Sequence, residues 1–226
     1  MKYQQAKFLS LLSVFLIIFL SFFVIQQGQA AVSQENALYQ SLSAKSDLNP
    51  KVLNLALKAH KKAKTKGITR SNLITVIDYS LPSTQKRLWV FDLEKKKMVY
   101  HTHVAHGSGS GVNYAKTFSN HPNSYQSSVG LFLTGTTYQG KHGRSLNLHG
   151  LEKGINSNAY QRRIVIHSAK YVGEHFIKSQ GRLGRSHGCP ALSPKMAVPI
   201  INKIKGGVLL FSYYPEPYWL GHSSFL

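Results

Sequence analysis

Short runs in which hydrophobic and polar residues alternate follow one another through most of the chain. Charged or glycine-rich turns separate them, and Glu94 to Lys97 looks like the tip of a hairpin. A period of two is typical of β-strands with one buried face. The pattern predicts a mainly β domain over residues 71–213, a sandwich or barrel with few helices. The alternating runs are 74–79, 86–93, 98–105, 129–138, 145–150, 162–167 and 207–213.

Two other stretches have helical spacing. In the first, Asn49 is a good N-cap and Pro50 suits the first helical position, while Gly67 suits the end. It belongs to a helical N-terminal segment, residues 31–70, and the second helix is expected at 194–205. The glycine- and serine-rich residues 107–128 are too long for an ordinary hairpin loop and suit a lid over a cleft. Residues 214–226 are expected to be a C-terminal tail.

Residues 1–30 have the features of a targeting segment. Lys2 and Lys7 precede an almost wholly apolar run, residues 8–25, and small residues follow at 28–30. This pattern predicts a signal peptide, or an uncleaved N-terminal anchor, and hence a protein exported to the periplasm or cell envelope.

Charge is the unusual feature of the composition. The formal net charge is +20, and removal of residues 1–30 leaves 26 basic against 8 acidic residues, or +18. Such a surface favours anionic neighbours, which for an exported protein are a membrane surface, acidic wall polymers or peptide carboxylates. No nucleic-acid-binding motif is present, so nucleic acid is not an expected partner. The oligomeric state is left open.

A single cysteine, Cys189, lies in the sequence Gly-Arg-Ser-His-Gly-Cys-Pro. A nucleophilic thiol needs an imidazole, a positive charge or a helix N-terminus nearby. His187, Arg182 and Arg185 are close in sequence, and a helix is expected to begin at Pro194. The other interpretation is a buried, inert cysteine, which this polar, glycine-rich setting makes less favourable.

A second histidine completes a catalytic arrangement. His167 ends a predicted strand, and the segment 169–185 separates Ser168 from Ser186. A base at a strand end and a nucleophile on a following turn can face each other across a β cleft. A histidine, a spacer of this length and Ser-His-Gly-Cys resemble the catalytic motif of the YkuD-type L,D-transpeptidases, which cross-link or remodel bacterial peptidoglycan. The resemblance covers about residues 74–213.

The resemblance implies roles for these residues. Cys189 would be the nucleophile, His167 the general base, and Gly188 with Cys189 part of the oxyanion hole. Ser186 and His187 would orient and line the pocket. The donor would be a stem tetrapeptide, with cross-linking, D-amino-acid exchange or L,D-carboxypeptidase action as the outcome. Pro190-Ala191 departs from the family pattern after the cysteine and resembles a divergent murein L,D-transpeptidase branch, which leaves Arg182 and Arg185 as candidates for the donor contact.

Several alternatives remain open at this stage. His149 is a rival base, and Arg144, Tyr138 and Asn147 either line the same cleft and bind substrate or are solvated strand residues. A histidine group at 101, 103 and 106 suggests zinc, but exposed strand histidines are commoner, and neither a metal nor another cofactor is expected. Another exported cysteine peptidase and a non-catalytic basic cell-wall-binding protein are the two competing functions.

Overall fold

The computed structural model describes residues 26, 29 and 32–226. Residues 32–41 are helical, and residues 42–226 form a compact unit. The expected targeting segment, residues 1–30, lies outside the described residues except for positions 26 and 29. Among the helices of the described part, none has the length and apolar character needed to cross a membrane.

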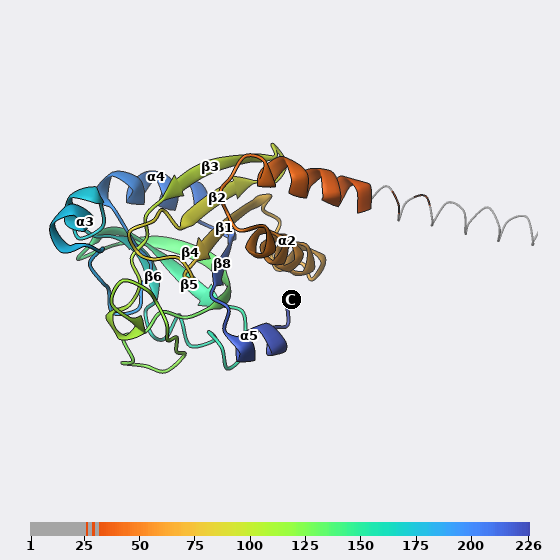
Figure 1. The fold of residues 1–226 in the computed structure, drawn as a ribbon. Coiled ribbons are helices and arrows are strands. Elements are labelled where there is room, and N and C mark those ends of the chain that lie inside the picture. Colours follow the sequence, from red (N-terminus) through yellow and green to blue (C-terminus); the bar gives the residue numbers. More distant parts are fainter. Residues whose placement is uncertain (1–25, 27–28, 30–31) are drawn as a thin grey trace, which may run out of the picture. The chain divides into compact units, whose positions relative to one another are not determined.

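Within residues 42–226, eight strands form one mixed sheet in the order β3-β2-β1-β8-β4-β5-β6-β7 (Figure 1). The pairs β1–β8 and β6–β7 are parallel, and the other neighbours are antiparallel. The expectation of a mainly β domain with few, short helices is confirmed. The strands are β1 (Leu73–Asp78), β2 (Leu88–Asp92), β3 (Lys97–Thr102), β4 (Gly130–Gly140), β5 (Gly143–Gly150), β6 (Val165–Ser168), β7 (Ala191–Leu192) and β8 (Leu209–Tyr213).

The N-terminal helix of this unit begins where its capping residues predict. The side chain of Asn49 accepts a hydrogen bond from the backbone N–H of Lys51, and Pro50 occupies the first turn. The lysines of this helix stay largely in solvent, while its apolar face is buried. The helices are α2 (Pro50–Thr65), α3 (Glu174–Gln180), α4 (Pro194–Ile204) and α5 (Pro217–His222), with a 3₁₀ turn η1 (Ser108–Ser110).

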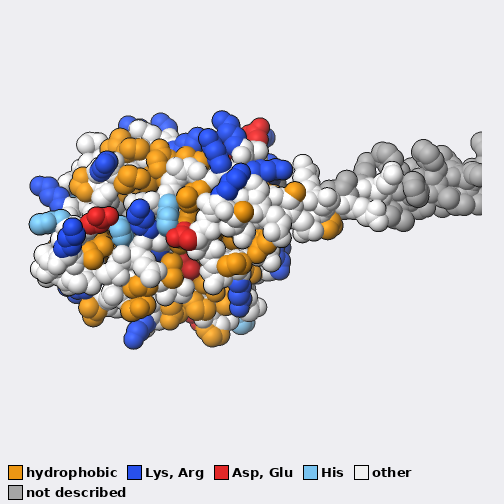
Figure 2. Space-filling view, turned by 45° about the horizontal axis from the view of Figure 1, so that its top comes forward, with side chains coloured by type: hydrophobic (Ala, Val, Ile, Leu, Met, Phe, Trp, Pro, Cys, Tyr) orange, Lys and Arg blue, Asp and Glu red, His pale blue; other side chains and the backbone are white. Residues whose placement is uncertain are grey.

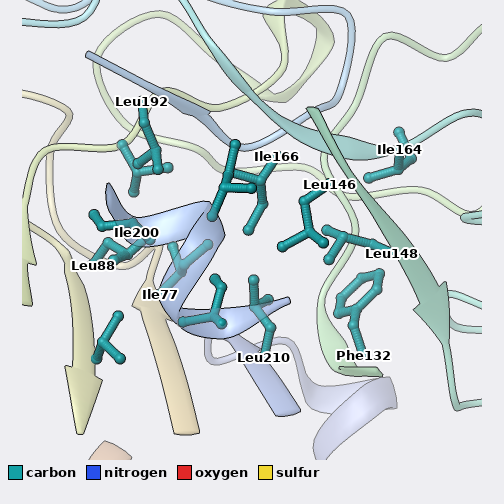
Figure 3. Close-up of a cluster of buried hydrophobic side chains, with 14 of the residues drawn as sticks. Ile77, Leu88, Phe132, Leu146, Leu148, Ile164, Ile166, Leu192, Ile200 and Leu210 are labelled. Carbon is teal, nitrogen blue, oxygen red and sulfur yellow. The ribbon is translucent and has the colours of Figure 1, made fainter. Parts of the chain in front are cut away.

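The hydrophobic core lies between the sheet and α4. Helix α4 remains one helix despite Pro199 and packs against β1, β5, β6 and β7. Figure 3 shows Ile200 of α4 among strand residues that include Ile77, Ile166 and Leu210, all of them buried. Because this core holds β6, β7 and α4 together, the residues at the ends of β6 and β7 have fixed positions.

Helix α5 lies in the segment 214–226, for which the sequence predicted no helix. The carboxylate of Glu216 caps its start by accepting the backbone N–H groups of Tyr218 and Trp219. The indole N–H of Trp219 also donates to the buried carboxylate of Glu152, at 3.2 Å from Oε1. The C-terminal residues are therefore docked on the domain by a buried polar contact.

Candidate active site

The turn that carries the cysteine, residues 186–189, is fixed by the side chain of its first residue. The hydroxyl of Ser186 accepts a hydrogen bond from the backbone N–H of Gly188 at 3.1 Å. The same hydroxyl donates to the carbonyl of Cys189 at 2.6 Å. Gly188 has a φ of +118°, which a residue with a Cβ rarely adopts. Serine and glycine at these positions thus make a tight turn that leaves Cys189 partly exposed.

Two residues from a distant loop, Gly107 and Ser127, support this turn. The backbone N–H of Gly107 donates to the Ser127 hydroxyl at 3.0 Å, and that hydroxyl donates to the carbonyl of Gly188 at 3.0 Å. The backbone N–H of Ser108 donates to the carbonyl of Ser186 at 2.8 Å. The two ends of the segment 107–128, which suits a lid by its sequence, thus form a loop wall that is hydrogen-bonded to the cysteine turn.

The thiol of Cys189 is held in its neutral form. Its sulfur lies 3.6 Å from the carbonyl oxygen of Arg163, to which the thiol donates. Burial raises the pKa of this thiol, and a backbone hydrogen bond at Val165 and the charge of Arg162 offset part of the rise. At neutral pH the sulfur therefore needs a base to take its proton.

His167 lies on β6, next to the strand that follows the cysteine. It pairs with Ala191 in the parallel β6–β7 ladder, and its backbone N–H donates to the carbonyl of Pro190 at 3.4 Å. Its ring nitrogen Nδ1 is 2.9 Å from the carbonyl oxygen of Ser168, so the hydrogen-bond pattern assigns the proton to Nδ1 and the lone pair to Nε2.

Burial is the main influence on this imidazole. It lowers the pKa of His167, the hydrogen bond to Ser168 opposes that effect, and the charges of His142 and Lys141 add to the lowering. His167 is therefore neutral at pH 7 and able to accept a proton. A neutral thiol in the turn before β7 and a neutral imidazole on the neighbouring strand β6 fit general-base catalysis better than a resting thiolate–imidazolium pair.

Arg162 is a site residue that sequence reasoning missed. Its guanidinium donates to the carbonyl oxygens of Ser119 and Gln126, at 2.5 and 2.7 Å, and to the hydroxyl of Ser128 at 2.6 Å. It is also the cation whose charge acts on the thiol of Cys189. Arg162 thus fastens the 119–128 loop beside the sulfur. Nothing in its sequence spacing marks it, because these contacts join segments that are far apart in the chain.

The sequence profile of the L,D-transpeptidase catalytic domain matches residues 44–213, which is most of the chain. The chain belongs to this family. The match includes α2 as well as strand β6, which carries His167, and the turn that carries Cys189. A search of curated protein sequences finds no match to the chain.

Solved L,D-transpeptidase structures are distant likenesses of this domain. One from Mycobacterium smegmatis is 15% identical over 64% of this chain and 59% of its own, with a TM-score of 0.39. One from Stackebrandtia nassauensis is 18% identical over 73% of this chain and 67% of its own, with a TM-score of 0.37. The match therefore spans about three fifths of the length of the M. smegmatis protein.

In this L,D-transpeptidase domain, the two backbone N–H groups predicted as oxyanion donors, those of Gly188 and Cys189, have different surroundings. The backbone N–H of Gly188 is already engaged by the Ser186 hydroxyl, so it does not point freely at a substrate. The N–H of Cys189 makes no hydrogen bond to any residue that the structure describes. In this turn the N–H of Cys189 is therefore the one without a hydrogen bond among the described residues, and the oxyanion role of Gly188 stays a prediction.

The three residues near the cysteine in sequence do not surround its sulfur. Arg182 donates to the carbonyl of Leu183 at 2.8 Å, and Arg185 donates to the carbonyl of Gly111 at 3.2 Å. The charges of both arginines act on His106, whose pKa is lowered to about 4 mainly by burial. His187 is exposed and packs on another loop. Arg162 is the arginine whose charge acts on the Cys189 thiol, and the donor contact expected of Arg182 and Arg185 stays a prediction.

The remaining predicted substrate residues lie on β4 and β5. Tyr138 is 45% exposed, and the amide of Asn147 donates to the carbonyl of Thr136 at 3.2 Å. Arg144 donates to the hydroxyl of Thr137 at 3.4 Å. The rival base His149 stacks on Tyr160, with 4.7 Å between ring centroids. These contacts leave a role for them in substrate binding untested, and none of them joins His149 to Cys189.

The three histidines that suggested zinc have separate partners. His101 stacks on Trp89, and its Nε2 lies 3.1 Å from the carbonyl oxygen of Lys86. His103 contacts the carbonyl oxygen of Thr84. His106 is fully buried and accepts a hydrogen bond from Arg87. No group of three metal-ligating side chains occurs among the residues that the structure describes.

Proposed function

We propose that this protein is an exported L,D-transpeptidase that uses Cys189 as its nucleophile on peptidoglycan stem peptides. The observation that carries the proposal is the cysteine turn itself. A partly exposed thiol is held in a turn by Ser186, and a neutral histidine, His167, lies on the adjacent strand. Family membership supports the peptide-transfer chemistry.

The first half-reaction starts from the two neutral groups. His167 accepts the thiol proton at Nε2 as the sulfur attacks the carbonyl carbon at the L-centre of the third, diacid residue of a stem tetrapeptide. The tetrahedral oxyanion then collapses, the peptide C–N bond breaks, and His167 returns the proton to the leaving amine of the terminal D-alanine. The product on the protein is a thioester with Cys189.

Two local groups stabilise charge in this scheme. The backbone N–H of Cys189 is the turn donor available to the oxyanion. The guanidinium of Arg162 adds a fixed positive charge near the sulfur as the thiol loses its proton. Because Arg162 is already held by loop carbonyls, this charge needs no rearrangement during the reaction.

The acceptor decides the outcome of the second half-reaction. An amine attacks the thioester carbonyl and gives a proton to His167. The C–S bond then breaks, the Cys189 thiolate takes that proton back from His167, and the new amide is a cross-link or carries an exchanged D-amino acid. Water attacks in the same way and releases a shortened peptide, which is carboxypeptidase action. All of these outcomes use one site.

We place this activity at the cell envelope because of the N-terminal targeting pattern and the charge. Figure 2 shows lysine and arginine side chains spread across the visible face of the described residues, with few acidic ones. The acyl donor carries carboxylates, and anionic wall polymers or membrane surfaces lie nearby, so a basic surface favours encounter with both.

The test is conversion of purified disaccharide-tetrapeptide muropeptides, followed by mass spectrometry. The native protein is expected to release D-alanine and form a thioester adduct on Cys189, and Cys189→Ala is expected to abolish both. A Cys189→Ala variant that converts the tetrapeptide as fast as the native protein would refute the proposal. Binding to intact sacculi without any conversion by the native protein would favour the wall-binding alternative.

A further inference from the structure

The tip of the β4–β5 hairpin reaches the histidine that we propose as the base. Gly140 and Gly143 are the last paired residues of the two strands, so Lys141 and His142 form a two-residue turn. Gly143 has a φ of +76°, which glycine adopts readily in such tight turns. The imidazole of His142 stacks on that of His167, with 4.6 Å between ring centroids and 29° between ring planes.

The stack brings together two residues whose surroundings differ. His167 is 4% exposed, whereas His142 is exposed on the hairpin tip. The edge of His167 that carries Nδ1 is held by the carbonyl of Ser168, which leaves the two faces of the ring to other neighbours. His142, an exposed residue, lies over one of these faces.

We propose that His142 is a positioning residue, whose ring covers one face of His167, holds the plane of the base and excludes water from it. This proposal rests on the proposed role of His167. It assigns the tip of the hairpin to the active site. His142 itself does not exchange a proton with substrate in this scheme.

The charges around His167 lower its pKa, as its burial does. Lys141 and His142 are the charged or titratable groups that approach it from the hairpin, and Cys189 precedes its β7 partner by two residues. Positive charge on Lys141, or on His142 when protonated, lowers the pKa of His167 in addition to burial. Burial and the neighbouring positive charge together keep His167 neutral at the pH at which it would act as a base.

Four variants separate the effect of the His142 ring from the effect of positive charge near His167. His142→Ala removes both, His142→Phe keeps a flat ring without the charge, and Lys141→Ala removes charge but leaves the stack. His222→Ala is the matched control, because His222 is another exposed histidine, stacked on Tyr218 at 4.2 Å in the C-terminal helix. All four changes lie at exposed positions, so thermal unfolding should be nearly unchanged.

The first measurement is the titration of His167 by side-chain ¹H–¹⁵N NMR, which does not depend on activity. We expect His142→Ala to raise the pKa of His167 because burial and a neighbouring charge are both lost. His142→Phe should raise it less, and His222→Ala should leave it unchanged. A His167 titration curve that is identical in the native protein and His142→Ala would overturn the proposal.

The second measurement is the pH profile of kcat and KM with a disaccharide-tetrapeptide. His142→Ala should lower kcat at pH 7 by about fivefold with KM nearly constant, and should move the acid limb to higher pH. His142→Phe should recover most of kcat, and a loss equal to that of alanine would count against the stacking role. If the native protein converts no tetrapeptide, the proposed function fails, while the NMR titration still decides the role of His142.

Discussion

Gly107 of the loop wall lies against the cysteine turn, and replacing it with alanine should disable the site without touching a reacting group. A Cβ on Gly107 would meet the carbonyl oxygen of Tyr125 and lie 2.8 Å from the Cα and 2.9 Å from the N of Gly188. Gly107 has a φ of −70°, which alanine also adopts, so the effect is purely steric.

The size of the effect follows from these distances. Carbon atoms in ordinary contact are separated by about 3.5–4.0 Å, so the Cβ requires the turn to move by about 1 Å. Overpacking of this kind costs about 1–3 kcal/mol in stability. A displacement of about 1 Å in a catalytic group can lower turnover by about 100-fold. We therefore expect Gly107→Ala to fold, with a lowered melting temperature and at least a tenfold loss of kcat.

The assay compares tetrapeptide turnover, thiol labelling and thermal unfolding for Gly107→Ala and Gly221→Ala. A Cβ on Gly221 meets nothing within 4 Å, so the control makes the same change without a clash and should be neutral or slightly stabilising in helix α5. Turnover by Gly107→Ala within twofold of the native value would refute the inferred contact with the cysteine turn. Equal losses in both variants would also refute it.

Three further predictions concern the same turn and its support. Ser186→Ala removes both hydrogen bonds within the turn and leaves the buried N–H of Gly188 unpaired. It should lower the free energy of unfolding in urea by about 2–3 kcal/mol. In steady-state kinetics it should change kcat more than KM. Alkylation of Cys189 by iodoacetamide should keep accelerating above about pH 8.5 in the folded protein, whereas the urea-unfolded protein levels off there; a folded-state plateau below that pH would contradict the raised pKa. Folding favours the neutral form of His106, because its pKa is lowered to about 4 in the folded protein. This preference stabilises the folded state fully above about pH 6.5, and about 3 kcal/mol of the free energy of unfolding is lost as the pH falls toward 4. Between pH 7.5 and pH 4.5, the free energy of unfolding measured with denaturant should fall less for His106→Gln than for the native protein.

The features that the sequence predicts well are those specified by neighbouring residues. Alternation located most strands to within a few residues, and Asn49 with Pro50 located the start of α2. The cysteine turn was also predictable, because Ser186, Gly188 and Cys189 lie within four positions and the bonds that shape the turn are local. Interactions between residues that are close in sequence can therefore be predicted from the sequence.

The features that the sequence does not reveal depend on contacts between distant segments. Arg162 reaches the carbonyl of Ser119 in a loop that precedes β4, and Gly107 meets Gly188 from a loop near the middle of the chain. Arg182 and Arg185 are near Cys189 in sequence, but the backbone directs them toward His106. The short elements α3 and β7 have too few residues to show a period, so alternation cannot detect them.

The resting state of the site also bears on the export that we propose. Oxidation of a cysteine follows its thiolate fraction and its exposure, and burial raises the pKa of Cys189. A single thiol without a disulfide partner is thereby less reactive toward oxidants while no substrate is bound. In the mechanism that we propose, His167, kept neutral by burial, generates the thiolate when a carbonyl is in place. If this mechanism holds, the same burial that slows unwanted chemistry at the sulfur makes turnover depend on His167 and on the residues that hold it in position.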